Sequence, residues 1–570
     1  MVLHIDRTLA QPPQAQEVNA HGVHAGWFSR IWVGSCSIHP PGADLPSVRI
    51  ECTDREKGSA HVAKDRLASV LERWEAVIGL EIHTELTSLN TKMFCGCPVA
   101  FGGEPNTRVC PVCLGMPGAL PVPNQAAIEA TVLAGLAINC AIAERSQFHR
   151  KNYFYPDMPK NYQISQYDLP FCEHGYVDVE IEPYGSPQRP DRDAAYTTRI
   201  GITRIHLEED TGKMIHVGGS EGRIAGATHS LVDFNRAGTG LMELVTEPDI
   251  RTPEEARRFA QKLRLIWLTL GISDCNMEEG SMRVDANVSV RPRGEIEFGT
   301  KAEVKNMNSF KSLHDALAYE IVRQAAEIEN GGAIVQETRH WDAGAKRTSS
   351  LRSKEEAHDY RYFPEPDMAP FEFTPEWIES VRSTLPELPD QKKRRLMDAY
   401  GIPAHDAAVL TGEDIDMAGF FEAAVAISGP ERAKAISNVM LNDLSMHLNA
   451  EGVSVAESKV VPSMVSELVA LVEVGTISSK QAKEVFTEMA ETGDAPGAIV
   501  ELRGMKQVSD TGPIEEVVDR VLAANPSQVE QYRGGKSTVI GFFVGQVMRE
   551  MDGQANPKVV NEVLARRLGG

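Results

Sequence analysis

The sequence predicts an α+β protein whose strands lie in the first two thirds of the chain and whose last third is helical. From Trp74 to about Pro370, short runs of alternating apolar and polar residues are mixed with occasional helical segments. Such alternation is typical of half-buried strands. After the proline-rich stretches at 363–366 and 385–389, helical periodicity dominates. With 42% hydrophobic residues in 570, the chain can bury several cores.

The first 72 residues are expected to form a mostly irregular leader. They contain two Pro-Pro pairs and five histidines and show little periodicity. Neither a secretory signal nor an organelle transit peptide fits this segment, which favours a cytoplasmic protein. A wrongly assigned start codon would also explain it. No apolar stretch is long enough to span a bilayer, so we expect no membrane association.

Three segments of the following region are predicted to be strands. They cover residues 77–86, 178–181 and 198–207, where apolar and polar residues alternate or β-branched residues gather. Residues 183–192 are rich in turn-forming residues and predict a loop.

A helix is predicted to begin after Thr252. Thr252 suits the N-cap, Pro253 the first helical position, and Glu255 the glutamate of a capping box. Apolar residues then recur at helical spacing up to Trp267, and Gly271 ends the pattern.

The helical last third is predicted to contain two further parts. Amphipathic helices are expected near residues 465–472 and 479–489. We therefore divide the chain into a leader (1–72), a mixed domain (73–385), a helical domain (386–495) and a helical tail (496–570).

The charge of the chain limits how it can bind nucleic acid. Acidic residues outnumber basic residues by 80 to 58, which gives a formal net charge of −22. This argues against binding through general attraction to phosphates, so any RNA contact must be local. The basic run at 392–395 is one candidate contact, although such runs more often form a solvated helix face.

Four of the nine cysteines form a cluster with the spacing of a metal site. The cluster consists of Cys95, Cys97, Cys110 and Cys113. Four thiolates on two short loops suit tetrahedral zinc, and they leave no position open for a substrate. We therefore predict a structural zinc clip, with four buried or free thiols as the alternative.

Two strand-like runs place ionisable side chains on one face. Glu81, His83 and Glu85 alternate in one run, and His206, Glu208 and Asp210 in the other, where Glu209 lies on the opposite side or at a turn. Carboxylates at this density suit magnesium together with substrate phosphates. A solvated strand face would show the same pattern.

Two more carboxylates stand alone in strand-like runs, namely Glu243 and Asp285. Single carboxylates of this kind are usually solvated or paired, but several of them in apolar strands favour a shared metal site. The usual phosphate-binding loops are missing, because Gly534-Gly535-Lys536-Ser537 lacks the first glycine of a P-loop. If ATP binds, magnesium and carboxylates must hold it.

Long stretches of the sequence resemble the GatB/GatE family of tRNA-dependent amidotransferase subunits, and the GatB branch in particular. The resemblance runs from Trp74 to the C-terminus. The stretches that carry it include GLEIHTEL from Gly79, RKNYFYPDMPKNYQISQYD from Arg150, GITRIHLEEDTGK from Gly201, EEGSMRVDANVSVRP from Glu278 and DYRYFPEPD from Asp359.

The resemblance implies a fold and an activity. The mixed domain is expected to be a cradle similar to glutamine synthetases and guanidino kinases, followed by a helical domain and a tail similar to YqeY. The family uses ATP and magnesium to phosphorylate the side-chain carboxylate of Glu-tRNA(Gln) or Asp-tRNA(Asn). Ammonia from a glutaminase-like A subunit then forms the amide, and a small C subunit completes the heterotrimer.

The resemblance also assigns roles to individual residues. Glu81, His83, Glu208, Glu209, Glu243 and Asp285 correspond to residues expected to hold magnesium and, through it, ATP. Lys151 and Glu209 are expected to be catalytic, with Lys151 at the exit of the ammonia channel. A lysine extending from an aromatic core is the alternative for Lys151. Cys95, Cys97, Cys110 and Cys113 match the branch of the family that binds zinc.

Two other functions are compatible with parts of the sequence. A non-catalytic tRNA-binding or assembly subunit could use the C-terminal helices and the basic run, but it would not need the dispersed carboxylates. A free-standing ligase would need its own source of ammonia, and no such domain is visible in the sequence.

Overall fold

The computed structural model describes residues 59–181, 195–218, 226–353, 360–412, 414–505, 511–551 and 555–569. They form two compact units. The first unit extends to Phe259 and continues from Asn276 to Thr374, and the second consists of Ala260–Cys275 and the chain from Pro375 onward. Within the described residues, no helix combines the length and the apolar character needed to cross a membrane.

The segment predicted to be an irregular leader ends in a helix. Helix α1 (Ser59–Arg73) directly precedes the first strand. Residues 59–72 contain no glycine or proline and include several strong helix formers, which accounts for the difference from the prediction. The part before Ser59 lies outside the described residues.

A large sheet forms the centre of the first unit. Among the described residues it has nine strands, and every neighbouring pair is antiparallel except β12 and β13. In spatial order they are β14 (Arg347–Ser353), β13 (Glu337–Asp342), β12 (Ala302–Lys305), β11 (Met282–Pro292), β1 (Trp74–Glu85), β10 (Gly240–Thr246), β7 (Tyr196–Glu209), β6 (Cys172–Ile181) and β2 (Ala141–Ile142).

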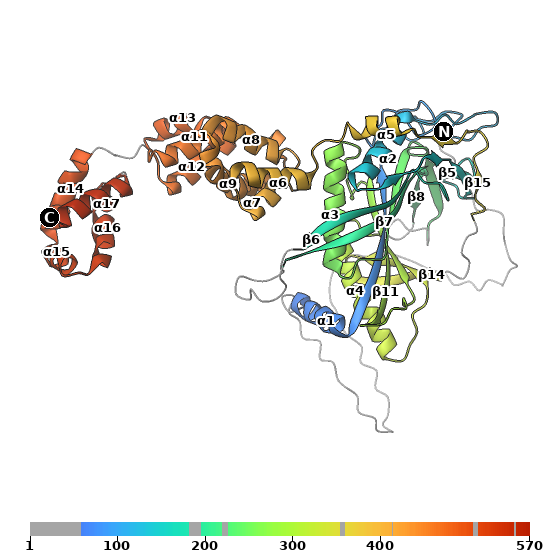
Figure 1. The fold of residues 1–570 in the computed structure, drawn as a ribbon, viewed down its shortest axis with the longest axis horizontal. Helices are drawn as coiled ribbons and strands as arrows, with labels where there is room; N and C mark the ends of the chain where they lie inside the picture. Colours follow the sequence, from blue (N-terminus) through green and yellow to red (C-terminus); the bar gives the residue numbers. More distant parts are fainter. Residues whose placement is uncertain are drawn as a thin grey trace, which may run out of the picture. The chain divides into compact units, whose positions relative to one another are not determined.

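One face of this sheet is the hydrophobic core of the unit. Val284, Ile82, Leu244 and Ile205 stand next to one another across four strands, and all four are buried. Helix α4 (Phe310–Glu329) packs against β11, beside which it lies in Figure 1. The opposite face is therefore the one that carries the ionisable side chains.

Helix α2 (Gln125–Ala137) packs against the end of the sheet formed by β2, β6 and β7. Gly135 makes this contact possible, because a Cβ atom at this position would lie 2.4 Å from the sulfur of Cys172 on β6. An alanine at this position would therefore push the helix away from the strand.

The described residues of the first unit also form three smaller sheets. They are β15 (Phe363–Pro364) with β4 (His149–Asn152) and β5 (Tyr162–Ser165), β16 (Phe371–Glu372) with β3 (Arg145–Ser146), and β8 (Lys213–Val217) with β9 (His229–Asp233). The β4–β5 hairpin brings the Lys151 region to the sheet, because β5 packs against β7.

Helix α3 (Pro253–Leu270) has the start that the sequence predicts. The backbone N–H of Glu255 donates to Oγ1 of Thr252 at 3.1 Å. The Glu255 carboxylate accepts from the N–H of Arg251 at 2.7 Å, one residue before the position that a capping box uses. Gly271 follows the helix with a φ of 67°, as expected for a C-terminal glycine.

Replacing Thr252 by alanine is expected to lower the free energy of unfolding by about 1 kcal/mol, because the amide of Glu255 loses its acceptor. Urea denaturation of the purified chain would measure the change. Thr252→Ser keeps the hydroxyl and serves as the control, so an equal loss in both variants would contradict the capping role.

The second unit is helical in all of its described parts. After α3, its α-helices are α5 (Pro375–Arg382), α6 (Pro389–Tyr400), α7 (Ala404–Leu410), α8 (Met417–Ser428), α9 (Ala433–Val439), α10 (Ser445–Glu451), α11 (Pro462–Glu473), α12 (Ser479–Thr492), α13 (Pro496–Arg503), α14 (Thr511–Ala524), α15 (Pro526–Arg533), α16 (Ile540–Glu550) and α17 (Pro557–Leu568). A π-helical turn at 440–444 joins α9 to α10.

In the described part of the second unit, these helices pack around two separate hydrophobic cores. One extends from Leu396 to Val500, and the other from Ile514 to Leu568. Helix α13 contributes Ile499 and Val500 to the first core. The second of these cores begins at α14.

The mixed first part and the helical second part are confirmed. Strands β6 and β7 contain two of the predicted strand segments, and β1 covers the third up to Glu85. Helices α3, α11 and α12 contain the predicted helices. The predicted loop at 183–192 lies outside the described residues.

Candidate metal and catalytic site

The ionisable face of the sheet is built by the register of four strands. His83 on β1 stands opposite Glu243 on β10, which stands opposite His206 on β7. Arg283 on β11 lies on the other side of His83. Because side chains alternate along a strand, these four side chains project from the same face.

The neighbouring rows on this face add further carboxylates. Glu81 pairs with Asp285 in the row on one side, and Glu208 pairs with Leu241 in the row on the other side. Five residues thus surround the centre of the sheet, namely Glu81, His83, His206, Glu208 and Glu243. We call them the carboxylate–histidine cluster.

Glu243 is the centre of this cluster. Its Oε2 atom lies 3.2 Å from Nε2 of His83 and 3.2 Å from Nε2 of His206. Glu81 and Glu208 each lie 3.8 Å from one of the two imidazoles. Two sets of possible metal ligands result, Glu81 with His83 and Glu243, and His206 with Glu208 and Glu243.

Because the cluster is buried, the pKa of each of its groups depends strongly on the charges of its neighbours. Burial alone would raise the pKa of Glu243, but the two histidines outweigh it and hold that pKa well below its usual range. Burial alone would lower the pKa of His206, but Glu243 and Glu208 raise it to about 9. The cluster therefore contains buried carboxylates that require a positive partner.

A divalent cation suits this requirement. Three carboxylates offer hard oxygen ligands, and the two imidazoles offer nitrogen ligands at the same centre. In this structure the two histidines balance the negative charge of Glu243. A metal ion bound at the same place could balance that charge in their stead. The residues present thus fit a site for a divalent metal ion.

Lys151 faces the cluster from strand β4. Its Nζ atom lies 5.1 Å from the centre of the Tyr360 ring. Burial alone would lower the pKa of Lys151, but the carboxylates of Glu208 and Glu243 are among the groups that raise it above its usual value. Lys151 is therefore a charged lysine beside the carboxylates of the site.

Strand β5 attaches this lysine-bearing hairpin to the acidic end of β7. The Ser165 hydroxyl donates to Oε2 of Glu208 at 3.0 Å, and the Ile164 N–H donates to Oε1 of Glu209 at 2.8 Å. Gln163 donates its side-chain amide to the backbone carbonyl of Glu209 at 2.7 Å. These bonds fix the position of Lys151 relative to Glu208.

Two of the six predicted magnesium ligands have other partners. Glu209, next to Glu208 on β7, forms a buried ion pair with Lys160 and is absent from both ligand sets. Asp285 accepts from Nζ of Lys305 at 2.6 Å. The structure therefore brings together Glu81, His83, Glu208 and Glu243, and their role as ligands remains a prediction.

The cluster borders two further features. A cavity of about 280 Å³ adjoins Glu81 and is lined by residues that include Gly79, Asn287 and Lys301. On the opposite side, Glu85 hydrogen-bonds Asp210, and burial raises the pKa of Glu85 to about 8.

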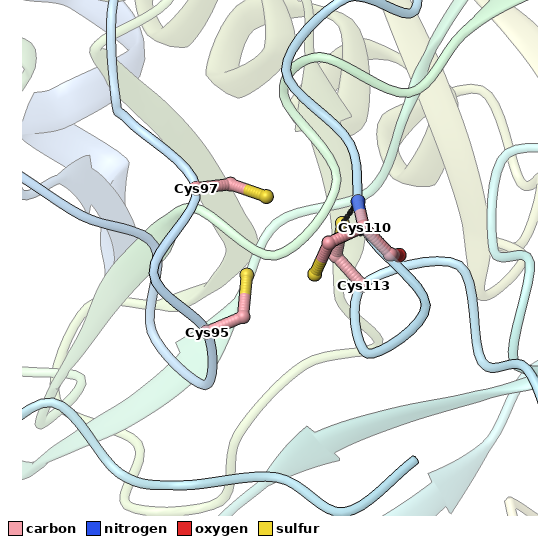
Figure 2. A group of neighbouring side chains, drawn as sticks. All are labelled: Cys95, Cys97, Cys110 and Cys113. Carbon is pink, nitrogen blue, oxygen red and sulfur yellow. Dashed lines mark hydrogen bonds between the residues drawn. The ribbon is translucent and has the colours of Figure 1, made fainter. Parts of the chain in front are cut away.

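The four clustered cysteines form a second candidate metal site. Figure 2 shows Cys95 and Cys97 on one loop, facing Cys110 and Cys113 on another. Their sulfur atoms all lie within 4.8 Å of one another. The Cys95 thiol, together with other neighbours that include the buried Lys92 ammonium, lowers the pKa of Cys113 to about 5 in spite of burial. A thiolate at this position and three more sulfur ligands could hold a zinc ion.

Comparison with known proteins identifies the family. Residues 76–379 match the sequence profile described as the GatB/GatE catalytic domain, and residues 419–568 match the profile described as the GatB domain. The chain belongs to the GatB/GatE family. The segment that matches the GatB/GatE catalytic domain contains the carboxylate–histidine cluster, Lys151 and the four cysteines. It also contains the large sheet except for the first two residues of β1.

Several curated GatB relatives resemble the chain over almost their entire length. The relative from Carboxydothermus hydrogenoformans is 52% identical over 498 residues, which are 87% of this chain and 99% of the relative. Relatives from Geobacter sp. (strain M21) and Acaryochloris marina are 52% and 50% identical, with coverage of 87% of this chain and of 100% and 98% of the relatives. All three are named as the B subunit of an aspartyl/glutamyl-tRNA(Asn/Gln) amidotransferase.

Sequence reasoning placed His206 beside Glu208 but did not select it as a site residue. Its Nε2 atom contacts Glu243, and its Nδ1 atom accepts from Nε of Arg204 at 3.3 Å. The alternating run from Arg204 to Asp210 already indicated the side on which His206 lies. The pairing of β7 with β10, which the GatB/GatE motifs do not reveal, was needed to show its contact with Glu243.

Proposed function

We propose that this chain is the B subunit of a tRNA-dependent amidotransferase and activates the carboxylate of Glu-tRNA(Gln), Asp-tRNA(Asn) or both. The observation that carries the proposal is the carboxylate–histidine cluster with Lys151 beside it, inside the family's catalytic domain. The names of the relatives support the same reaction class.

In the proposed reaction, a carboxylate oxygen of the tRNA-bound side chain attacks the γ-phosphorus of ATP, and ADP leaves. Ammonia then attacks the acyl carbon, and inorganic phosphate leaves with formation of the amide. Magnesium held by Glu81, His83, Glu208 and Glu243, with His206 beside them, would neutralise the phosphate charge. The cavity beside Glu81 offers space next to these ligands for a further part of the nucleotide.

Lys151 is proposed to bind the substrate. The carboxylates of Glu208 and Glu243 keep its ammonium group charged. This charge can hold the substrate carboxylate and then stabilise the oxyanion that develops when ammonia attacks. Glu209, expected from the resemblance to be catalytic, contributes by holding Lys160 and β5 in place.

Replacing Lys151 by methionine is expected to lower the rate of amide formation about 10²-fold, because the developing oxyanion loses a preorganised charge. Amide formation from misacylated tRNA at saturating ATP would measure this. Lys311→Met removes an exposed lysine from α4 and is the matched control. Equal rates for Lys151→Met and the unmodified complex would contradict the proposed role.

The proposed partners are a glutaminase-like A subunit, which supplies ammonia, a small C subunit, and the misacylated tRNA. The reaction would take place in the cytoplasm. The division into cradle, helical domain and YqeY-like tail, and the likeness of the cradle to glutamine synthetases and guanidino kinases, belong to the same proposal. In the basic run at 392–395, Arg395 is already paired with Glu387 and Glu422, which gives an RNA-binding adaptor little support.

The proposal is tested by ATP turnover in the complex with its A and C partners. Turnover that requires Glu-tRNA(Gln) or Asp-tRNA(Asn) and yields the corresponding amide is the expected result, and it identifies the substrate. Binding of tRNA without ATP turnover on either substrate would contradict the proposal and favour an adaptor.

A further inference from the structure

Five tyrosines near Lys151 form two groups of contacting rings. They are Tyr153, Tyr155, Tyr167, Tyr360 and Tyr362, which we call the tyrosine shelf. The rings of Tyr167 and Tyr362 are stacked, with centres 4.5 Å apart and planes at 16°. Tyr153 is stacked on Tyr155 at 5.7 Å, and Tyr360 meets Tyr362 edge-on at 6.1 Å.

Part of this shelf is open to solvent. Tyr167 is 60% exposed and Tyr155 is 41% exposed, and the adjacent Phe154 and Phe363 are also exposed. Grouped aromatic side chains on a surface are a frequent mark of a binding site, because each loses water-exposed area when a partner covers it. The Tyr167–Tyr362 pair presents a flat ring that is already held in place by its neighbour.

The shelf adjoins the carboxylate–histidine cluster. Lys151 lies 5.1 Å from the Tyr360 ring. Burial raises the pKa of Tyr362 to about 12, and the smaller influences on it come from Lys151, Glu208 and Glu243. Tyr362 is therefore within electrostatic reach of the cluster, so a ligand on the shelf would lie next to the site of reaction.

The terminal nucleotide of the proposed aminoacyl-tRNA substrate must lie near the tyrosine shelf. The reacting carboxylate of this substrate is joined to the terminal ribose of the tRNA by one amino acid and an ester, a span on the order of 7 Å, or two extended residues. When the carboxylate reaches Lys151, the terminal nucleotide must therefore lie close by. This nucleotide is unpaired, and its base is free to stack.

We propose that the tyrosine shelf binds the terminal base of the aminoacyl-tRNA by stacking it on the exposed face of Tyr167. This inference rests on the proposed function and extends it to a binding site for RNA. Proteins commonly recognise unpaired nucleotides by stacking their bases on aromatic side chains. Stacking also suits a chain with a net charge of −22, which is poorly equipped to attract phosphates in general.

The test is Tyr167→Ala in the complete complex. Loss of one stacked base is expected to raise the KM for the aminoacyl-tRNA about tenfold. The KM for ATP should not change, and Tyr167→Trp should restore the tRNA affinity because it restores an aromatic face. Phe101→Ala removes another exposed aromatic side chain of the same unit and is the matched control.

A second measurement identifies the nucleotide that is bound. Binding of an RNA minihelix that ends in the unpaired acceptor sequence is compared with binding of one that lacks the last nucleotide. The truncation should weaken binding to the unmodified complex about tenfold and should have little effect on Tyr167→Ala.

Three results would overturn the inference: an unchanged KM for aminoacyl-tRNA in Tyr167→Ala, a rise in the KM for ATP alone, and loss of either partner protein from the variant complex during purification. The second would assign the shelf to the base of ATP and the third to a partner protein. A failure of the proposed function itself differs from all three, because the unmodified complex would then form no amide from either misacylated tRNA.

Discussion

Glu243→Gln is expected to lower ATP-dependent amide formation by about 10³-fold or more. Glu243 is only 6% exposed, contacts both histidines of the cluster, and belongs to both sets of possible metal ligands. A glutamine has nearly the same shape but lacks the negative charge. The loss of several kcal/mol of charge stabilisation in the transition state corresponds to a rate effect of this size.

The metal role of Glu243 can be separated from its effect on rate. Binding of Mn²⁺, as a paramagnetic substitute for magnesium, is measured by electron paramagnetic resonance in the absence of tRNA. Glu243→Gln should bind the ion much more weakly, whereas Glu372→Gln, which changes an exposed glutamate of the same unit, should bind it normally. Normal Mn²⁺ affinity in Glu243→Gln would rule out its proposed role as a ligand.

Cys110→Ser is expected to have the second large effect, on stability. The unmodified chain should contain one zinc ion, and the variant should lose it, because a serine hydroxyl is a poor replacement for the fourth thiolate. Loss of a structural metal is expected to cost about 4 kcal/mol of unfolding free energy. For the domain that contains the clip, this corresponds to a fall in Tm of roughly 10 °C.

Elemental analysis for zinc and thermal unfolding with and without a chelator would check this expectation. Cys275→Ala changes a buried cysteine outside the cluster and should leave the zinc content unchanged. Surviving Cys110→Ser protein should retain most of its specific activity, since zinc is proposed to fasten the loops only. Normal stability of the chain after zinc removal would refute a structural clip.

The sequence predicted elements better than their ends. Residues 77–86 alternate so regularly that strand β1 follows from the pattern alone, and Thr252 with Pro253 locates the start of α3. Proline and helical periodicity mark the start of α13, but they do not show that its apolar residues join the core of the preceding helices. That depends on side-chain contacts between helices.

The site could be predicted only in part, because the sequence shows patterns within one strand but not contacts between strands. Strand alternation gives the face of each side chain, so Glu81 and His83 could be grouped from the sequence. Only the register between strands shows that Glu243 meets both His83 and His206. The resemblance joined Glu208 and Glu209 as one acidic pair, whereas consecutive residues of a strand point in opposite directions, and the two have different partners.

The two adjacent glutamates at the end of β7 also bear on how the chain folds. If β7 were to pair one residue out of register, every side chain on it would exchange faces. Glu208 would then lose Ser165, and Glu209 would lose Lys160 and the amide of Ile164. A slipped strand would thus leave buried carboxylates without partners, which is costly. The pair therefore discriminates against misfolded pairings of the central sheet, and substitutions at Lys160 or Ser165 should yield more aggregated protein during refolding.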